Sequence, residues 1–210
     1  MDYPIDFSTV RLETERLVLR PIELSDVEAI YEYARDERVA LKAGFFPSES
    51  LDHTLEVVKQ FIADPCDFAI EHERRMIGCV SLNKHSDLLY PELRRKVYRE
   101  AGYVLHPNYW NQGIMTEAFK MMVDYSFRHF PLDLILVSHA IDNLNSSRVI
   151  EKSGFKFFKY KQVRYTWRTD LLQFRVHMMT RDDWRQLNPH PKYRVLNTKI
   201  ETKTLPLGVL

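Results

Sequence analysis

The stretch that decides the fold of this chain is residues 102–118, GYVLHPNYWNQGIMTEA. It begins as a β-strand, is broken by Pro107, turns through residues 111–113 and continues as a helix from Thr116. The first turn of a helix has four backbone N–H groups without internal partners, and the helix dipole places positive potential there. The joint therefore predicts an anion site suited to a diphosphate.

Gly113 is the residue on which this interpretation depends. Because glycine has no Cβ, the backbone can approach a ligand closely at this turn, and Thr116 can add a hydroxyl donor. A glycine at a strand–helix joint can also be there for steric reasons alone, and the residues leave this alternative open. The stretch matches neither G-x-G-x-x-G nor G-x-x-x-x-G-K-[ST], which argues against dinucleotide and Walker sites.

A second block lies downstream at residues 143–155, NLNSSRVIEKSGF. It predicts a short helix over residues 145–153 that ends at Gly154, a residue type common directly after a helix. Taken alone, Asn143 and Ser146 are ordinary polar residues of a helix start.

The other elements follow from hydrophobic periodicity on both sides of these blocks. We expect a strand over 16–22, helices starting near Ser25 and Ser50, a hairpin of 68–72 and 76–82, a helix over 116–130, a strand over 134–141, and strands over 155–167 and 171–179 with Thr169 and Asp170 near their turn. The charged residues 84–99 are expected at the surface. This order predicts a mixed sheet with helices on both faces.

Composition and charge exclude several classes of protein. Hydrophobic residues make up 45% of the 210 residues, enough for a substantial core. Thirty Lys and Arg oppose 29 Asp and Glu, so the formal charge of +1 creates no overall attraction to nucleic acid or anionic membranes. No apolar run approaches the roughly 20 residues of a membrane span, and the first residues lack a signal-peptide layout. We therefore expect a cytoplasmic protein without nucleic-acid or membrane partners.

Cysteine and histidine spacing predicts no disulfide framework and no metal site. Cys66 and Cys79 are not spaced as a redox or ligand pair, so we expect buried thiols. The eight histidines show no H-E-x-x-H or similar spacing. His106, next to Pro107, is expected to be a strand-end residue and not a catalyst.

Together the two blocks resemble the acetyl-CoA motifs of the GNAT N-acetyltransferase superfamily. Residues 102–118 are similar to the motif built on [QR]-x-x-G-x-[GA], and residues 143–155 to N-x-x-S-x-x-x-x-x-K-x-G-F. The chain has Trp110 in place of Gln or Arg, and Met115 in place of the second Gly or Ala. The RimJ/RimL-like branch, which acetylates ribosomal-protein N-termini, tolerates both changes, so the resemblance points to that branch.

The edges of the domain also resemble this family, with TERLVLRP at residues 14–21 and TRDDW at residues 180–184. The resemblance implies a GNAT acetyltransferase domain over residues 10–187. Residues 188–210 would be a C-terminal tail, flexible or partner-binding. The implied fold is α+β (α/β/α), a mixed, mostly antiparallel sheet of about seven strands flanked by about four helices. A splayed central strand pair would form the acetyl-CoA cleft.

The resemblance further implies the reaction. The enzyme would move the acetyl group of acetyl-CoA to a primary amine, either a protein N-terminal α-amine or a small-molecule amine, by direct attack in a ternary complex and without a metal. The implied cofactor-binding residues are Val104, Leu105, Gln112, Gly113, Ile114, Met115, Thr116, Asn143, Ser146 and Lys152.

Two side chains are expected to carry the proton transfers. Many GNATs have a Tyr seven residues after the Asn of the second block, but this chain has Ile150, so Ser146 is the expected donor to the leaving sulfur, with helix capping as the alternative. Glu100 is the expected base, with Glu71 as a second candidate and a structural ion pair as the alternative reading of Glu100. The N–H of Leu105 is expected to face the thioester oxygen.

Other classes of function stay open on the sequence. A catalytically silent acyl-CoA-binding sensor or scaffold would keep the same motifs, and an α/β interaction protein would need Gly113 only for steric reasons. Tyr103, Tyr109 and Trp110 either line the cleft or belong to the core. We expect a monomer or a homodimer, and the acceptor amine is not readable.

Overall fold

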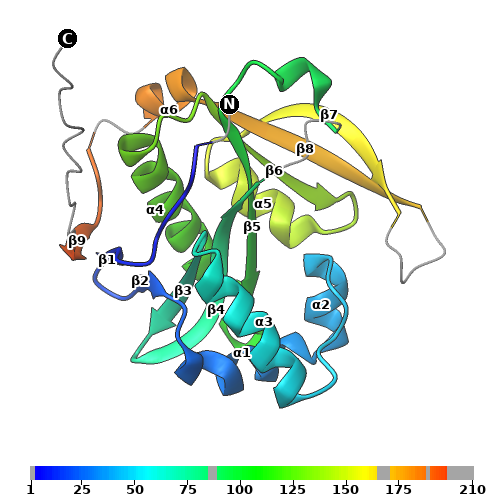
Figure 1. Ribbon diagram of the computed structural model, residues 1–210. Helices are drawn as coiled ribbons and strands as arrows, with labels where there is room; N and C mark the ends of the chain where they lie inside the picture. The colour runs from blue at the N-terminus through cyan, green and yellow to red at the C-terminus, as the bar shows by residue number, and fades with distance from the viewer. Residues whose placement is uncertain (1–2, 85–88, 165–170, 188–189, 198–210) are drawn as a thin grey trace, which may run out of the picture.

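The computed structural model describes residues 3–84, 89–164, 171–187 and 190–197. Within them lies one sheet of nine strands in the order β7-β8-β6-β5-β4-β3-β2-β1-β9 (Figure 1). Only β5 and β6 run parallel, and the other neighbours are antiparallel. The strands are β1 (Arg11–Glu13), β2 (Val18–Pro21), β3 (Asp67–His72), β4 (Arg75–Asn83), β5 (Tyr98–Leu105), β6 (Leu134–Ala140), β7 (Lys156–Val163), β8 (Leu172–Thr180) and β9 (Arg194–Asn197).

Helices cover both faces of the sheet. In the described ranges they are α1 (Val27–Ala34), α2 (Glu37–Ala43), α3 (Leu51–Ala63), α4 (Ile114–His129), α5 (Leu144–Lys152) and α6 (Arg181–Leu187), with 3₁₀ turns η1 (Leu24–Asp26), η2 (Pro91–Leu93) and η3 (Pro107–Tyr109). Helices α4, α5 and α6 share one hydrophobic core with the sheet, and α1, α2 and α3 share another.

The alternation of side chains along each strand builds the two cores. In β3, Phe68 and Ile70 lie in the core under α4, whereas Ala69 lies with Ile30 and Val58 under α1 and α3. Since successive strand residues point to opposite faces, one buried strand serves both layers. This three-layer arrangement confirms the mixed α+β fold.

The parallel pair at the centre of the sheet separates along its length. Pairing runs from Tyr98 opposite Leu134 to Ala101 opposite Val137 and then stops. Strand β5 continues to Leu105 and β6 to Ala140, so the two strands form a fork. Helices α4 and α5 begin beyond the open end of this fork, which confirms the expected splayed pair.

The described residues contain nine strands and six α-helices, against the about seven strands and about four helices that the resemblance implies, and several of these elements are short. Helix α2 is an example, with only seven residues. It is defined by its ends: the Asp36 side chain accepts from the N–H of Arg38, and Gly44 closes the helix with a φ of 85°. Strands β1 and β9, of three and four residues, lie at the far edge of the sheet.

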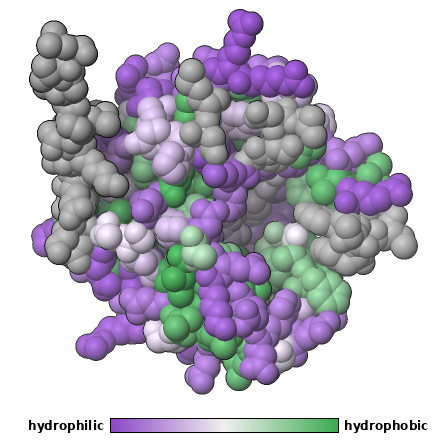
Figure 2. Space-filling view, viewed as in Figure 1, coloured by the Kyte–Doolittle hydropathy of each residue, from purple (hydrophilic) through white to green (hydrophobic). Residues whose placement is uncertain are grey.

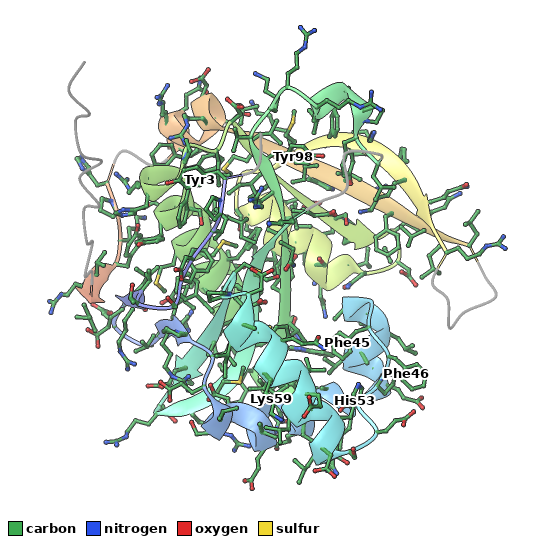
Figure 3. The ribbon with its side chains drawn as sticks, in the orientation of Figure 1. Tyr3, Phe45, Phe46, His53, Lys59 and Tyr98 are labelled. Atoms are coloured by element: carbon green, nitrogen blue, oxygen red, sulfur yellow. The ribbon has the colours of Figure 1, made fainter. Side chains whose placement is uncertain are left out.

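The expectation that residues 84–99 lie at the surface is wrong at four of the described positions. Tyr90, Leu93, Tyr98 and Arg99 are buried, and the first three belong to a third hydrophobic cluster between η2 and the sheet. The Arg99 guanidinium donates to the carbonyl oxygens of Tyr98 and Tyr3. Figure 3 shows Tyr3 and Tyr98 at the same end of the molecule. The two tyrosines thus pack against β6 and β8, and Arg99 contacts an N-terminal residue.

Several expectations concern residues near gaps in the described ranges. Strand β7 ends at Val163 and β8 begins at Leu172; the expected extension over 165–167 and the turn at Thr169 and Asp170 lie outside the described residues. In the segment expected to be a tail, β9 pairs with β1. Residues 198–210 lie outside the described ranges.

The face of the molecule seen in Figure 2 is mostly polar. In Figure 2, hydrophobic residues gather over α2 and the loop after it, where Leu41 and Phe46 are exposed. None of the helices within the described ranges is long and apolar enough to cross a membrane. Both cysteines are free thiols. Cys79 is buried as expected, whereas Cys66 is only half-buried.

Candidate functional site

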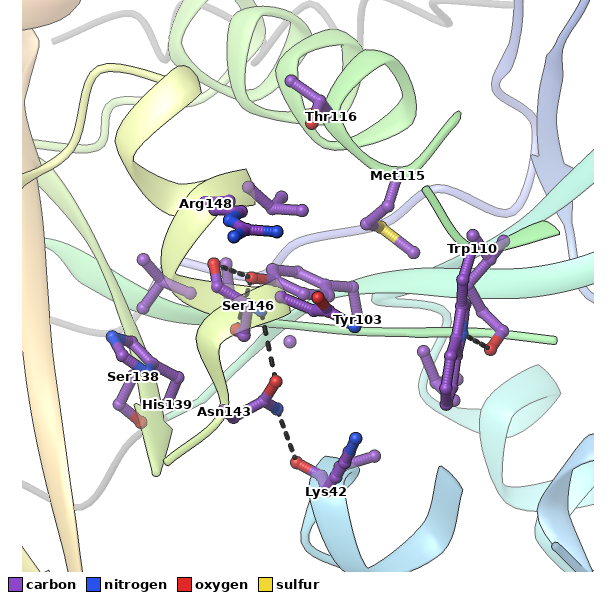
Figure 4. Close-up of a pocket in the computed structure, with 18 of the residues that line it drawn as sticks. Lys42, Tyr103, Trp110, Met115, Thr116, Ser138, His139, Asn143, Ser146 and Arg148 are labelled. Atoms are coloured by element: carbon purple, nitrogen blue, oxygen red, sulfur yellow. Dashed lines mark hydrogen bonds between the residues drawn. The ribbon is translucent and has the colours of Figure 1, made fainter. Parts of the chain in front are cut away.

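A cavity of about 560 Å³ opens where β5 and β6 separate (Figure 4). All but one of the predicted site residues line it: Glu100, Val104, Leu105, Gly113, Ile114, Met115, Thr116, Asn143, Ser146 and Lys152. The exception is Gln112, whose exposed side chain donates to the carbonyl oxygen of Asn108. Glu71, the second base candidate, instead forms ion pairs with Arg20 and Arg11.

The turn between β5 and α4 presents backbone to this cavity. Asn111 and Gly113 have φ values of 61° and 75°, both in the left-handed region. Gly113 is the N-cap of α4, so the N–H groups of the first helical turn are directed outward. Arg16 donates to the Gln112 carbonyl oxygen over 3.2 Å and to Glu117 over 2.7 Å. These contacts hold the turn in place.

Trp110 has a role that the sequence reasoning missed. Its indole Nε1 donates to the carbonyl oxygen of Leu105 over 2.8 Å, which ties the turn to the end of β5. The Lys42 ammonium of α2 lies 5.4 Å from the Trp110 ring centroid, a cation–π contact. Trp110 thus joins β5, the turn and α2 at the position where the motif usually has a polar residue.

The backbone of Leu105 is directed into the fork. The N–H of the next residue, His106, donates to the Ile77 carbonyl oxygen on β4 over 2.8 Å. Because N–H and C=O groups alternate sides along a strand, those of Leu105 point away from β4. The bond from Trp110 to the Leu105 carbonyl fits this direction. The expected orientation of the Leu105 N–H is therefore supported.

His106 lies directly after β5, as expected of a strand-end residue. Its Nδ1 accepts from the N–H of Asn108 and so caps η3, and its Nε2 lies 3.3 Å from Glu32 on α1. It is absent from the residues lining the cavity, which supports a structural role.

Asn143 and Ser146 lie together at the start of α5. The Asn143 Oδ1 accepts from the N–H of Ser146, and its Nδ2 donates to the Lys42 carbonyl oxygen over 3.4 Å. Asn143 therefore caps the start of α5, which is the role that the sequence left open for both residues. The Ser146 hydroxyl is engaged differently, at 2.7 Å from the hydroxyl of Tyr103 on β5.

Glu100 lies beside the branch point of the fork. Its Oε1 accepts from the Ser138 hydroxyl over 2.6 Å and from the Lys161 ammonium over 2.8 Å. The pair with Lys161 is largely buried, with side-chain exposures of 16% and 17%. Glu100 therefore forms the structural ion pair that the sequence left open as an alternative. If Oε1 took up a proton, it would have to displace one of these two hydrogen-bond donors.

Cations lie along the same cavity. Arg148 and Lys152 of α5, Lys42 of α2 and Lys84 after β4 all line it, against a single carboxylate, Glu100, among its lining residues in the described ranges. The helix start at Gly113 adds positive potential. The cavity is therefore suited to a ligand with several negative charges. Sequence analysis had pointed to Lys152 but not to Arg148, which has no motif of its own.

Asp67 is a buried carboxyl behind the cavity wall. Its partner Cys66 donates weakly to it and to Asn83, which lines the cavity. Burial raises the pKa of Asp67 to about 7, although the Cys66 contact opposes this. Because the folded state holds this proton more tightly than the unfolded chain, whose Asp pKa is about 4, stability should fall as pH rises from about 4 to about 7.

Replacement of Asp67 by Asn should abolish this loss of stability at higher pH. We expect Asp67→Asn to exceed the wild type at pH 8 by on the order of 2 kcal/mol in free energy of unfolding, and to match it near pH 4.5. Urea unfolding at the two pH values measures the difference. Asp182→Asn, at an exposed aspartate, is the control. Equal effects of both changes at both pH values would contradict the prediction.

The described residues hold no group of three or more His, Cys, Asp or Glu side chains that could bind a metal ion. Two buried histidines do lie close together, with ring centroids of His139 and His177 5.4 Å apart. Burial lowers the pKa of both rings, so they are held neutral.

The family model described as acetyltransferase (GNAT) domain matches residues 16–156. Among curated relatives, the uncharacterized N-acetyltransferase YnaD of Bacillus subtilis (strain 168) is 29% identical over 155 residues, or 71% of this chain and 86% of YnaD.

Solved structures share the fold. Spermidine N-acetyltransferase from Vibrio cholerae, in complex with CoA and spermine, superposes with a TM-score of 0.68 at 20% identity, covering 82% of this chain and 99% of that chain. An acetyl transferase from Salmonella typhimurium that modifies the N-terminal serine of ribosomal protein L7/L12 has a TM-score of 0.67 at 17% identity, covering 80% and 96%.

Proposed function

This chain belongs to the GNAT acetyltransferases and is an acetyl-transferring enzyme, and from this premise we propose that it moves the acetyl group of acetyl-CoA to a primary amine by direct attack in a ternary complex. The observation that carries the proposal is the left-handed turn at Gly113, which directs the first N–H groups of α4 toward the fork cavity. A diphosphate bound there would accept from those groups.

The surroundings of Gly113 fit such a ligand. A Cβ built at Gly113 would meet only the tip of Arg16, at 3.6 Å, so no packed neighbour demands a glycine here. At Gly78, by contrast, a Cβ would lie 2.3 Å from the Val104 carbonyl oxygen, which is a steric requirement. Packing therefore does not require a glycine at position 113. The left-handed φ of 75° favours one, and this φ shapes the turn that we assign to the ligand. Lys152 and Arg148 would complete the neutralisation of the phosphates.

The chain would act on the thioester through its backbone and two side chains. When bound, acetyl-CoA supplies an activated acetyl group. The Leu105 N–H would hold the carbonyl oxygen as negative charge develops, an effect of about 3 kcal/mol for one such donor. Val104 would form the adjacent wall. Ser146 would protonate the leaving sulfur, and Glu100 would accept the amine proton directly or through water.

The acceptor class and the branch are finer points of the same proposal. The Trp110 and Met115 departures favour the RimJ/RimL-like branch, and thus a protein N-terminal α-amine. The superposed structures carry names that refer to a small polyamine and to a ribosomal-protein N-terminus, so both acceptor classes suit this fold. Only one carboxylate, paired with Lys161, lines the described part of the cavity, which is poor complementarity to a polycation.

We expect CoA to bind in calorimetry and free thiol to appear from acetyl-CoA when an acceptor is added. The panel should contain spermidine, free amino acids and peptides with free or acetylated N-termini. Thiol release with free but not blocked N-termini supports the proposal. Binding without release on any acceptor would favour a silent acyl-CoA sensor, and absence of CoA binding would overturn the site itself.

Within that assay, Glu100→Gln tests the base. Loss of the carboxylate should lower kcat by about 100-fold near neutral pH, because a positioned base contributes at least that much. Glu92→Gln is the matched control, since Glu92 also pairs with a lysine, Lys159, but lies outside the cavity. If the two variants have the same activity, Glu100 serves only its ion pair.

A further inference from the structure

The Tyr103 side chain joins the two arms of the fork. It leaves β5 on the face of α4, where its ring packs edge-on against Phe119 with centroids 5.0 Å apart. Its hydroxyl lies 2.7 Å from the Ser146 Oγ and 3.2 Å from the Ser146 carbonyl oxygen (Figure 4). Tyr103 and Ser146 both line the cavity. The phenol is thus in contact with the hydroxyl expected to face the leaving sulfur.

The environment keeps this phenol protonated. Burial raises the pKa of Tyr103 well above its usual value, although the hydrogen bond to Ser146 opposes the shift. Tyr103 therefore carries a proton that it can donate throughout the neutral range.

If Ser146 were the only proton donor, it would be left with an unfavourable negative charge. If Ser146 gave its proton to sulfur without replacement, an alkoxide would remain in a cavity wall, where unpaired charge is costly. Asn143 fixes the Ser146 backbone but accepts from its N–H, so it supplies no proton to the hydroxyl. The Tyr103 hydroxyl lies at hydrogen-bond distance from Oγ and can supply one.

Resting on the proposed acetyl transfer, we propose that Tyr103 is the positioning residue of the Ser146 donor and replaces its proton during the reaction. As the C–N bond forms and the C–S bond breaks, the electron pair of the C–S bond stays on sulfur. Ser146 Oγ gives its proton to that sulfur and takes the proton of the Tyr103 hydroxyl. The amine nitrogen loses one proton to Glu100 or water, and solvent in the cavity returns one to Tyr103, so the protons balance.

The experiment uses Tyr103→Phe, which keeps the ring against Phe119 and removes only the hydroxyl. With the fastest acceptor of the panel above, kcat should fall by about 100-fold, while CoA affinity and thermal midpoint stay unchanged. Ser146→Ala should lower kcat by a similar factor. The double variant should lose little more than either single change, because the two hydroxyls act as one unit. Tyr160→Phe, on the exposed side of β7, is the matched control.

The pH dependence of kcat distinguishes a proton-donating tyrosine from one with a purely structural role, because a structural tyrosine would not change it. Fluorotyrosine at position 103 keeps the ring nearly the same size and makes the phenol more acidic. If Tyr103 donates, the alkaline limb of the kcat profile moves to lower pH. If the limb does not move, or if the Tyr103→Phe and Ser146→Ala losses multiply, the role is overturned while acetyl transfer by the wild type stands. A wild type without acetyl transfer overturns the proposed function instead.

Discussion

Replacement of Gly113 by Val should reduce CoA affinity by at least about 100-fold, or about 2.8 kcal/mol. Two effects add. Gly113 has a φ of 75°, and a β-branched residue is strongly disfavoured in that conformation. The turn would therefore change its backbone and redirect the N–H groups at the start of α4. The new side chain would also occupy the space in which we place the diphosphate.

Calorimetry with CoA measures this loss of affinity. Urea unfolding measures the loss of stability that backbone strain causes. Gly44→Val is the matched control, because Gly44 has a φ of 85° at the end of α2 and lies outside the cavity lining. Both variants should lose stability, but only Gly113→Val should lose CoA affinity. Wild-type affinity in Gly113→Val would remove the central support of the proposed site.

Replacement of Arg20 by Met should lower the free energy of unfolding by about 3–5 kcal/mol, the usual result of removing one partner from a buried ion pair. Arg20 is 8% exposed. Its guanidinium binds both Asp26 oxygens at 2.7 and 2.8 Å and Glu71 at 2.6 Å. These carboxylates raise the pKa of Arg20 further, against the effect of burial. The network ties β2 to η1 and β3.

Urea unfolding checks this prediction, with two further variants as comparison. Arg38→Met breaks an exposed arginine–aspartate pair on α2 and should leave the unfolding midpoint almost unchanged. Arg20→Met combined with Asp26→Asn should recover part of the lost stability, because a neutral amide leaves less uncompensated charge in the interior. Equal midpoints for Arg20→Met and the wild type would show that the network contributes nothing.

Features that depend on residues close together in the sequence could be predicted without the structure. The turn at Gly113 and the helix ending at Gly154 follow from local chemistry, namely a φ that only glycine adopts easily and the unpaired groups of helix ends. The strands around them follow from hydrophobic alternation over a few residues. The burial of Tyr90, Leu93 and Tyr98 was misjudged because they pack against β6 and β8, which lie far away in the chain. Arg99 was misjudged because it donates to Tyr3, 96 positions away.

The order of elements, the turn at Gly113 and the block around Asn143 were determined by the sequence itself, because each depends on contacts within a few residues. The partners of the side chains were decided only by the tertiary structure. Tyr103 meets Ser146, 43 positions away, and Glu100 meets Lys161, 61 positions away, only because β5, α5 and β7 converge at the fork. Periodicity shows which face a residue takes but not which distant residue it meets there, so these pairings depend on how the layers pack.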